Sequence, residues 1–196
     1  VASMCRISTV APRDLVPHPI DGGRAYALAF EVYCEEGIAK LLSMSEATPG
    51  LRIILFNPDA VVGPVHVITA VDYAVTSFRL GLNTARSLHI EAFLYAAATR
   101  EISKALELFQ PDANEKRAVA VLVADSAEAC IKGVVALCER VKASISPIGY
   151  SEKAARLLAQ KLRIEEKEIR ATYSTDFASA VEKCLLSRMA LEFLSR

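Results

Sequence analysis

The chain has 196 residues, of which 53% are hydrophobic, and its 23 basic and 23 acidic residues give a formal net charge of zero. That composition is typical of a chain with a sizeable buried core and excludes a disordered or fibrous protein. It also excludes a broadly basic nucleic-acid-wrapping protein, although it allows a local basic patch. No apolar run reaches the roughly 18 residues of a membrane span.

The cysteines indicate the redox compartment. The chain has five of them, an odd number, and no two form a Cys-x-x-Cys pair. We find no secretory signal in the sequence, so the pattern favours reduced, mostly buried thiols rather than a disulfide framework. We therefore expect a cytoplasmic protein, and nothing in the sequence calls for a metal or a cofactor.

The first part of the chain predicts two strands separated by a short helix. Residues 1–23 combine prolines with two adjacent glycines, which indicates an irregular leader with a short strand near 6–10. Large side chains alternate over 24–34, which is typical of a strand. A short helix is expected over 38–47. A β-branched run bounded by turn residues predicts a buried strand over 51–57.

The middle of the chain predicts three helices. From Pro64 onward the apolar residues recur at i, i+3, i+4 and i+7, and Gly81 is placed to end this amphipathic helix. Asn83 or Thr84 is then expected to cap a second helix. Thr99 is expected to open a third.

The second half predicts a further strand followed by helices. Residues 118–124 are continuously apolar and indicate a strand, after which Asp125 or Ser126 caps a helix that runs to about Val141. Beyond residue 150 the pattern gives two or three more helices. The whole order predicts an α+β fold: a mixed β-sheet packed with several helices, and a helical C-terminal segment.

A search for catalytic motifs finds none. The chain has no GxxxxGK[ST] phosphate loop, and no GxGxxG follows a strand. The histidines His18, His66 and His89 lack the spacing of metal ligands, so structural roles are favoured for them. No catalytic residue and no metal ligand is therefore predicted.

One acidic residue nevertheless stands out, because Glu91 lies inside an otherwise apolar helix. A buried carboxylate must find a partner, and Arg86 and Arg100 are candidates. A structural ion pair is the favoured interpretation. The alternative is a small-molecule-binding or enzymatic α/β domain with a pocket near His89 and Glu91.

The middle of the chain, FNPDAVVGPVHVITAVDYAVTSFRLGLNTARSLHIEAFLYAAATREISKAL, has a recognisable order of elements. They are an Asn57-Pro58 strand end, a helix opening with His66, a Gly81-x-Asn83 turn, Ala85-Arg86, Glu91 and Thr99-Arg100-x-Ile102. In this order they resemble the small kinase-binding subunit of the KEOPS complex, the family of the PRPK-binding protein. The resemblance spans 24–196, which we take as a single domain.

This resemblance implies a non-catalytic α/β subunit whose C-terminal tail docks on a small kinase-like ATPase. The complex of that family helps to install threonylcarbamoyl on an adenosine beside the tRNA anticodon. Archaeal-type members also bind the tRNA CCA end. The implied partners are thus the KEOPS kinase-like ATPase and tRNA, with no membrane and no DNA.

The chain departs from the family pattern at two places. Where the family commonly has Arg-Gln-Ile, this chain has Arg100-Glu101-Ile102, and where a glycine tends to follow the next helix it has Gln110-Pro111. A carboxylate in place of an amide repels phosphate, which weakens the case for tRNA contact at Glu101.

The C-terminal segment predicts a partner-docking helix over about 175–196. Its apolar residues form two stripes, which is more than a helix lying on one core usually needs. The predicted kinase-partner interface consists of Leu185, Leu186, Arg188, Met189, Ala190, Phe193 and Leu194. Two alternatives stay open: the helix is a fully buried element of its own domain, or a homodimer covers it.

A basic window in the middle of the chain is the candidate tRNA surface. A single-stranded RNA end is held by phosphate contacts and base stacking, and Tyr73 and Tyr95 could offer stacking faces. The predicted tRNA-binding residues are Arg79, Asn83, Arg86, Arg100 and Lys104. The alternative is an ordinary solvated, charged helix surface.

Overall fold

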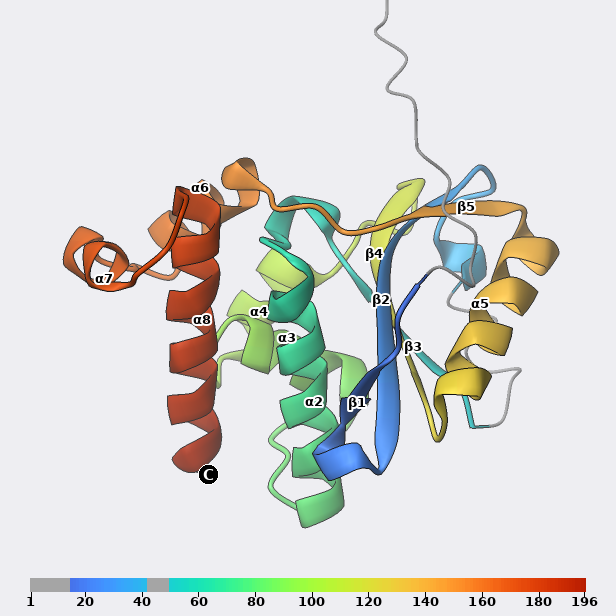
Figure 1. Cartoon of the computed structure of the whole chain (residues 1–196), viewed down its shortest axis with the longest axis horizontal. Coiled ribbons are helices and arrows are strands. Elements are labelled where there is room, and N and C mark those ends of the chain that lie inside the picture. The colour runs from blue at the N-terminus through green and yellow to red at the C-terminus, as the bar shows by residue number, and fades with distance from the viewer. Residues whose placement is uncertain (1–14, 42–49) are drawn as a thin grey trace, which may run out of the picture.

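A five-stranded sheet forms the centre of the molecule in a computed structural model that describes residues 15–41 and 50–196 (Figure 1). The strands are β1 (His18–Ile20), β2 (Ala25–Cys34), β3 (Arg52–Phe56), β4 (Arg117–Ala124) and β5 (Ala143–Ser146). The order is β1-β2-β4-β3, and β5 pairs with the far end of β2, on the same edge as β1. Every pairing is antiparallel, so the prediction of a mixed sheet is wrong in this respect.

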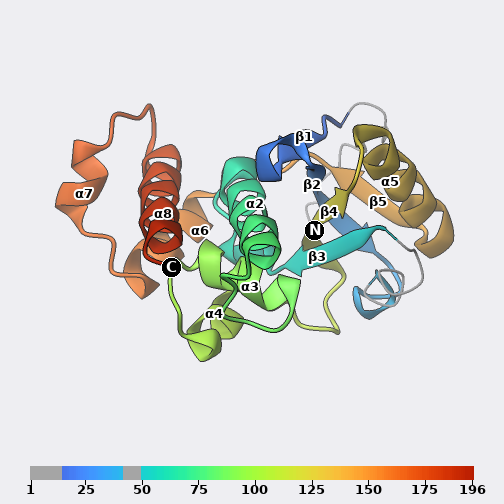
Figure 2. The same cartoon turned by 90° about the horizontal axis from the view of Figure 1, so that it is seen from below.

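Helices cover both faces of this sheet. Two 3₁₀ turns, η2 (Asp21–Gly23) and η3 (Pro58–Ala60), accompany α2 (Pro64–Leu80), α3 (Leu88–Ala96), α4 (Ile102–Phe109), α5 (Ala127–Val141), α6 (Glu152–Lys161), α7 (Glu166–Ala171) and α8 (Phe177–Leu194). Helix α5 lies on one face, whereas α2, α3, α4 and α8 lie on the other (Figures 1 and 2). The predicted α+β class is confirmed.

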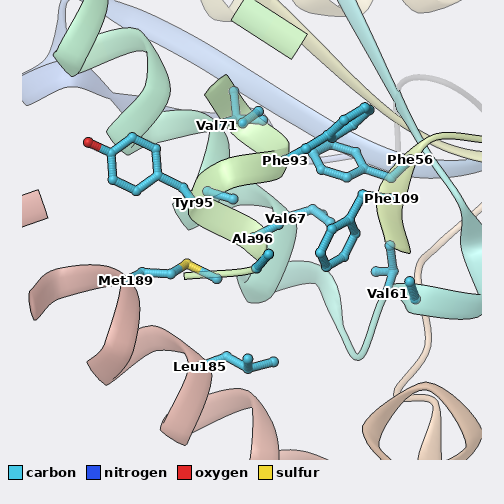
Figure 3. Close-up of a cluster of buried hydrophobic side chains, with 14 of the residues drawn as sticks. Phe56, Val61, Val67, Val71, Phe93, Tyr95, Ala96, Phe109, Leu185 and Met189 are labelled. Atoms are coloured by element: carbon cyan, nitrogen blue, oxygen red, sulfur yellow. The ribbon is translucent and has the colours of Figure 1, made fainter. Parts of the chain in front are cut away.

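The sheet separates two hydrophobic cores. Strand β4 is apolar throughout because both of its faces are covered: Val119, Val121 and Val123 face the larger core, and Ala120 and Leu122 face α5. The larger core is built around aromatic side chains that α3, α4 and β3 bring together (Figure 3). Helix α8 closes this core from outside, so the C-terminal segment belongs to the same core as the sheet.

Most predicted elements are found, but strand β5 was not predicted and several helices begin at other residues than expected. Helix α3 begins after Ser87 and not after Asn83 or Thr84, because the amides of Thr84 and Ala85 bind the Glu91 carboxylate at 3.0 and 2.7 Å. Helix α4 follows Glu101 instead of Thr99. Of the two candidate caps for α5, Ser126 is the one used.

The predicted leader is more regular than expected. Residues 18–20 form strand β1 on the edge of β2, and residues 21–23 form the turn η2. The predicted strand near residues 6–10 and most of the predicted helix over 38–47 lie outside the described residues.

Helix α8 is attached to the start of α2 by a buried carboxylate. Glu182 is only 3% exposed, and its Oε1 accepts a hydrogen bond of 2.9 Å from the amide of His66, 116 positions earlier in the chain. The amide of Val65 and the hydroxyl of Tyr150 also donate to this carboxylate. The first amides of a helix lack partners within the helix and carry partial positive charge, so Glu182 supplies the cap that Gly63 cannot. Burial nevertheless raises the pKa of Glu182 above its ordinary value.

Replacing Gly63 by alanine should lower the free energy of unfolding by about 1–3 kcal/mol. A Cβ there would lie 2.6 Å from Glu182 Oε1 and 2.8 Å from a Tyr150 ring carbon. The backbone at Gly63 is extended, with φ −170°, so the cost is one of space and not of conformation. Urea denaturation measures the change.

The control is Gly149→Ala, because a Cβ at Gly149 meets nothing within 4 Å. It should change the unfolding free energy by less than about 0.5 kcal/mol. Equal stability of the two variants would contradict the close approach of Glu182 to α2.

Candidate protein-interaction surface

Helix α8 has a core side. Leu185 and Met189 are both 0% exposed and pack with Tyr95 and Ala96 of α3 and with Val67 of α2 (Figure 3). The structure therefore removes Leu185 and Met189 from the predicted partner interface. The reason is that α8 packs against α2, α3, α6 and α7 together, so one helix can bury more than one apolar stripe within its own domain.

The opposite side of α8 keeps large apolar groups in solvent. Leu194 is 80% exposed and Leu191 is 68% exposed. They are three residues apart, so they are neighbours on the helix surface. The predicted interface included Leu194 but missed Leu191, although the sequence places it on the stripe of Lys183 and Ser187, which are also exposed. We call Leu191 and Leu194 the α8 leucine pair.

The remaining apolar residues of the predicted interface are intermediate. Leu186, Ala190 and Phe193 are half-buried. The Phe193 ring stacks on Tyr73 of α2 with centroids 4.8 Å apart. This contact ties the end of α8 to α2 and places the α8 leucine pair beside the α2–α8 junction.

Arg188, which was predicted to contact the partner, is engaged within the chain. Its guanidinium donates to both carboxylate oxygens of Glu168 at 2.9 and 2.6 Å, and to the carbonyl oxygens of Leu162 and Arg163 at 2.8 and 3.2 Å. It therefore fastens α7 and the end of α6 to α8. Helix α7 has no fully buried residue and lies at the outer edge of the molecule in Figure 1. Besides this guanidinium, Ile169 attaches it by packing against the larger core.

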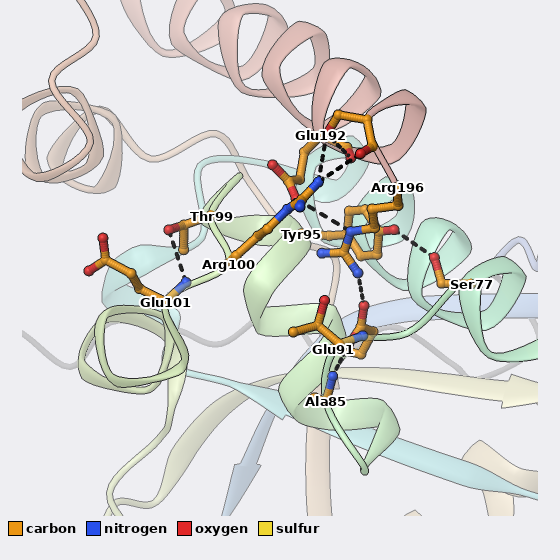
Figure 4. A network of polar contacts seen from close by, with 11 residues as sticks. Ser77, Ala85, Glu91, Tyr95, Thr99, Arg100, Glu101, Glu192 and Arg196 are labelled. Carbon is orange, nitrogen blue, oxygen red and sulfur yellow. Dashed lines mark hydrogen bonds and ion pairs between the residues drawn. The ribbon is translucent and has the colours of Figure 1, made fainter. Parts of the chain in front are cut away.

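Glu91 is fully buried, and both oxygens of its carboxylate bind groups of the same chain (Figure 4). Besides the two amides of the turn before α3, it forms an ion pair with Arg196, whose side chain is 4% exposed. The Arg196 guanidinium also lies 4.2 Å above the centre of the Tyr95 ring. The predicted structural ion pair is thus present, but its basic partner is neither Arg86 nor Arg100.

This environment argues against the alternative of an acid–base pocket. A carboxylate with two backbone donors and a guanidinium has no exposed oxygen with which to meet a substrate. His89 is exposed and its ring contacts Phe93, with centroids 6.0 Å apart, and it makes no hydrogen bond to Glu91. Among the described residues, no group of three histidine, cysteine, aspartate or glutamate side chains could hold a metal ion.

The predicted tRNA-binding residues do not form one surface. Arg79 donates to both oxygens of Asp21 at 2.8 Å, and Arg100 donates to Glu192 at 2.7 Å and to Ser195 at the end of α8. The Asn83 amide donates to the carbonyl of Ala85 at 2.9 Å. These three side chains make contacts within the chain, and of the four basic residues the described ion pairs leave Arg86 and Lys104 without a carboxylate within 4 Å.

Tyr73 and Tyr95 cannot stack on a nucleic-acid base as predicted. Tyr95 is 0% exposed, and its hydroxyl is 2.6 Å from Ser77 Oγ. Tyr73 is covered by Phe193 and by Tyr95. Both rings were predicted to be free because helical spacing alone does not reveal which side of α2 or α3 another helix covers.

One basic surface was missed in the sequence. Lys104 lines a polar hollow of about 560 Å³ together with Lys161 and Arg163, which come from the end of α6. Glu101 and Glu107 lie on the same hollow, and Lys161 pairs with Glu107 at 2.9 Å. We call it the α4–α6 hollow.

Deleting residues 185–196 should unfold the domain, because α8 is part of the larger core and not only a docking element. Loss of Leu185 and Met189 alone corresponds to about 4–10 kcal/mol, at roughly 2–5 kcal/mol for each buried side chain. That is comparable with the total stability of a typical domain, about 5–15 kcal/mol. Circular dichroism of the deleted chain should show no cooperative melt, whereas the double variant Leu191→Ser, Leu194→Ser should melt as the full chain does. A deleted chain with an unchanged melt would contradict the placement of α8 in the core.

No helix among the described residues is long and apolar enough to cross a membrane. Comparison with known proteins gives one family match. None of the curated proteins matches the chain significantly. A family model described as kinase binding protein CGI-121 matches residues 35–192, which includes every helix from α2 to α7 and most of α8. The chain belongs to the CGI-121 family of kinase-binding proteins.

Proposed function

We propose that this chain is a non-catalytic subunit of a KEOPS-type complex that binds the kinase-like ATPase through the α8 leucine pair and supports threonylcarbamoyl modification of tRNA. The observation that carries the kinase contact is the exposure of Leu191 and Leu194 on a helix that is otherwise part of the core. Large exposed apolar side chains on a fixed element mark protein-interaction surfaces.

The fixing of α8 favours this docking surface. Glu182 anchors the helix near its start, and the pairs of Arg196 with Glu91 and of Arg100 with Glu192 anchor its end. A partner therefore does not need to order the helix when it binds, which lowers the entropic cost of association. Half-buried Leu186 and Ala190 extend the apolar area beside the leucine pair.

The double variant Leu191→Asp, Leu194→Asp should lose kinase binding and keep its fold. Burial of two leucines contributes about 3 kcal/mol or more, so the dissociation constant should rise at least roughly a hundredfold. The measurement is calorimetric titration of the purified kinase-like ATPase from the same source, with a thermal melt of each variant.

The matched control is Val135→Asp, which changes a 38% exposed apolar residue of α5 on the opposite face of the sheet. It should bind the kinase normally. If the leucine variant binds as tightly as the unmodified chain, the docking surface lies elsewhere. Light scattering of the chain alone tests the homodimer alternative, because a dimer that dissociates in the leucine variant would assign the pair to self-association.

For tRNA we propose the α4–α6 hollow as the contact, with Arg86 as a second, separate point. Lys104 and Arg163 make no ion pair within 4 Å among the described residues, so their charges are available to phosphate. The carboxylates of Glu101 and Glu107 on the same rim reduce the net positive charge, which predicts weak binding that depends on salt.

Reversing the charge with Lys104→Glu and Arg163→Glu should weaken tRNA binding and reduce the slope of log K against log salt by about one for each lost phosphate contact. Fluorescence anisotropy with labelled tRNA at several salt concentrations measures both quantities. Arg140→Glu is the control, because Arg140 is an exposed residue of α5. This variant should change neither the affinity for tRNA nor the salt slope. An unchanged slope in the double variant would exclude this hollow.

We also propose a cytoplasmic setting. The four described cysteines, Cys34, Cys130, Cys138 and Cys184, are all free thiols. Burial raises the pKa of Cys130 and of Cys138, which keeps both in the unreactive thiol form. Such thiols suit a reducing compartment.

A further inference from the structure

A second polar hollow lies at the end of the sheet where β2 and β3 begin and β4 ends. Its volume is about 540 Å³, and the last turns of α2 form its other wall. Three arginines from three different elements line it: Arg24 before β2, Arg52 at the start of β3 and Arg79 near the end of α2. We call it the arginine hollow. None of these arginines takes part in the α8 leucine pair or in the α4–α6 hollow.

The described residues do not balance the charges around this hollow. Asp21 is 5% exposed, and its carboxylate already accepts from Arg79 Nε at 2.8 Å and from the Thr76 hydroxyl at 3.1 Å. Arg24 donates only to the Asp21 carbonyl, at 3.3 Å, and neither Arg24 nor Arg52 has a carboxylate within 4 Å among the described residues. The two Nη atoms of Arg79 also have no described partner. Among the described residues of the rim, the other acid is Asp125, which is exposed.

The position of Arg79 is fixed by a network beneath it. The Asp21 amide donates to Asp72 Oδ1 at 2.7 Å, which holds the turn η2 against α2. Arg79 therefore presents its terminal nitrogens from a preorganised position, and Arg24 and Arg52 converge on the same hollow from the sheet. Guanidinium groups in such an arrangement bind phosphate oxygens by paired hydrogen bonds.

Other side chains of the hollow suit a ligand larger than an inorganic anion. Val75, Phe78 and Val123 give it apolar walls. Asp125 on the rim can accept hydrogen bonds from ribose hydroxyls or from the amino group of a base. We propose that the arginine hollow binds the phosphate group of a nucleotide, with its nucleoside against the apolar wall, either as a free nucleotide or as one unit of an RNA strand.

The test is calorimetric titration of the full chain with AMP and, separately, with inorganic phosphate at the same pH, where the two carry similar charge. AMP should bind more tightly than phosphate. Arg24→Ala and Arg52→Ala should each weaken AMP binding about tenfold, because each removes a charge-assisted hydrogen bond to the phosphate. Both side chains are exposed, so the melts should not change.

Arg140→Ala is the matched control, because Arg140 is an exposed arginine on α5 that does not line the hollow. It should bind AMP normally. No AMP binding together with RNA binding that is insensitive to Arg24→Ala and Arg52→Ala would overturn the proposal. Equal affinity for AMP and phosphate would overturn its nucleoside part.

A short single-stranded RNA distinguishes the two sources of the nucleotide. If the RNA binds more tightly than AMP and both arginine variants weaken it, the site takes a unit of an RNA strand. If AMP binds as tightly as the RNA, the site takes a free nucleotide. Kinase binding by the arginine variants should stay normal in either case, so failure here is separate from failure of the docking surface.

Discussion

The arrangement of the helices depends on one buried carboxylate at the start of α2. Glu182 of α8 binds the first amides of α2, and the glycine before that helix leaves the space it needs. The neighbouring His66 is fully buried, with Nε2 3.0 Å from the carbonyl of Ala96 at the end of α3. Burial lowers the pKa of His66 to about 4, so its ring is neutral near pH 7 and adds no second charge beside the carboxylate. Three helices from distant parts of the chain thus meet at one point.

A second group of polar contacts fixes the other end of α8. Arg196, Glu192 and Arg100 link the end of this helix to Glu91 and to the turn after α3 (Figure 4). Held at both ends, α8 can serve two purposes: one side completes the core, and the other side presents Leu191 and Leu194 in a fixed direction. The division of one helix between folding and recognition explains why its sequence is apolar on more than one stripe.

Local patterns predicted much of the fold, and they failed where a side chain beyond the usual capping positions decides where an element begins. The period of α2, its end at Gly81 and the cap of α5 at Ser126 are set by residues within a few positions, so the sequence predicts them. The start of α3 is set by Glu91, whose side chain binds the preceding turn, and local capping preferences therefore pointed to the wrong residue.

Side-chain roles were harder to predict than elements. Arg100 and Arg188 look available in the sequence because their acidic partners, Glu192 and Glu168, lie on other helices. Likewise, counting stripes on α8 suggested more apolar surface than one domain could cover, since the sequence does not show how many helices surround it. The family resemblance, by contrast, rested on the order of several turns and helices, and the family match over residues 35–192 confirms it.

The place of α8 in the larger core also has a consequence for synthesis of the chain. Ribosomes release the polypeptide from its N-terminus, so α2 and α3 emerge long before residues 177–194 exist to cover them. Until then the aromatic surface around Tyr73 and Tyr95 is open to water, and the start of α2 lacks its cap. Partly folded chains with such uncovered apolar surface aggregate readily. The larger core can therefore close only after α8 has left the exit tunnel.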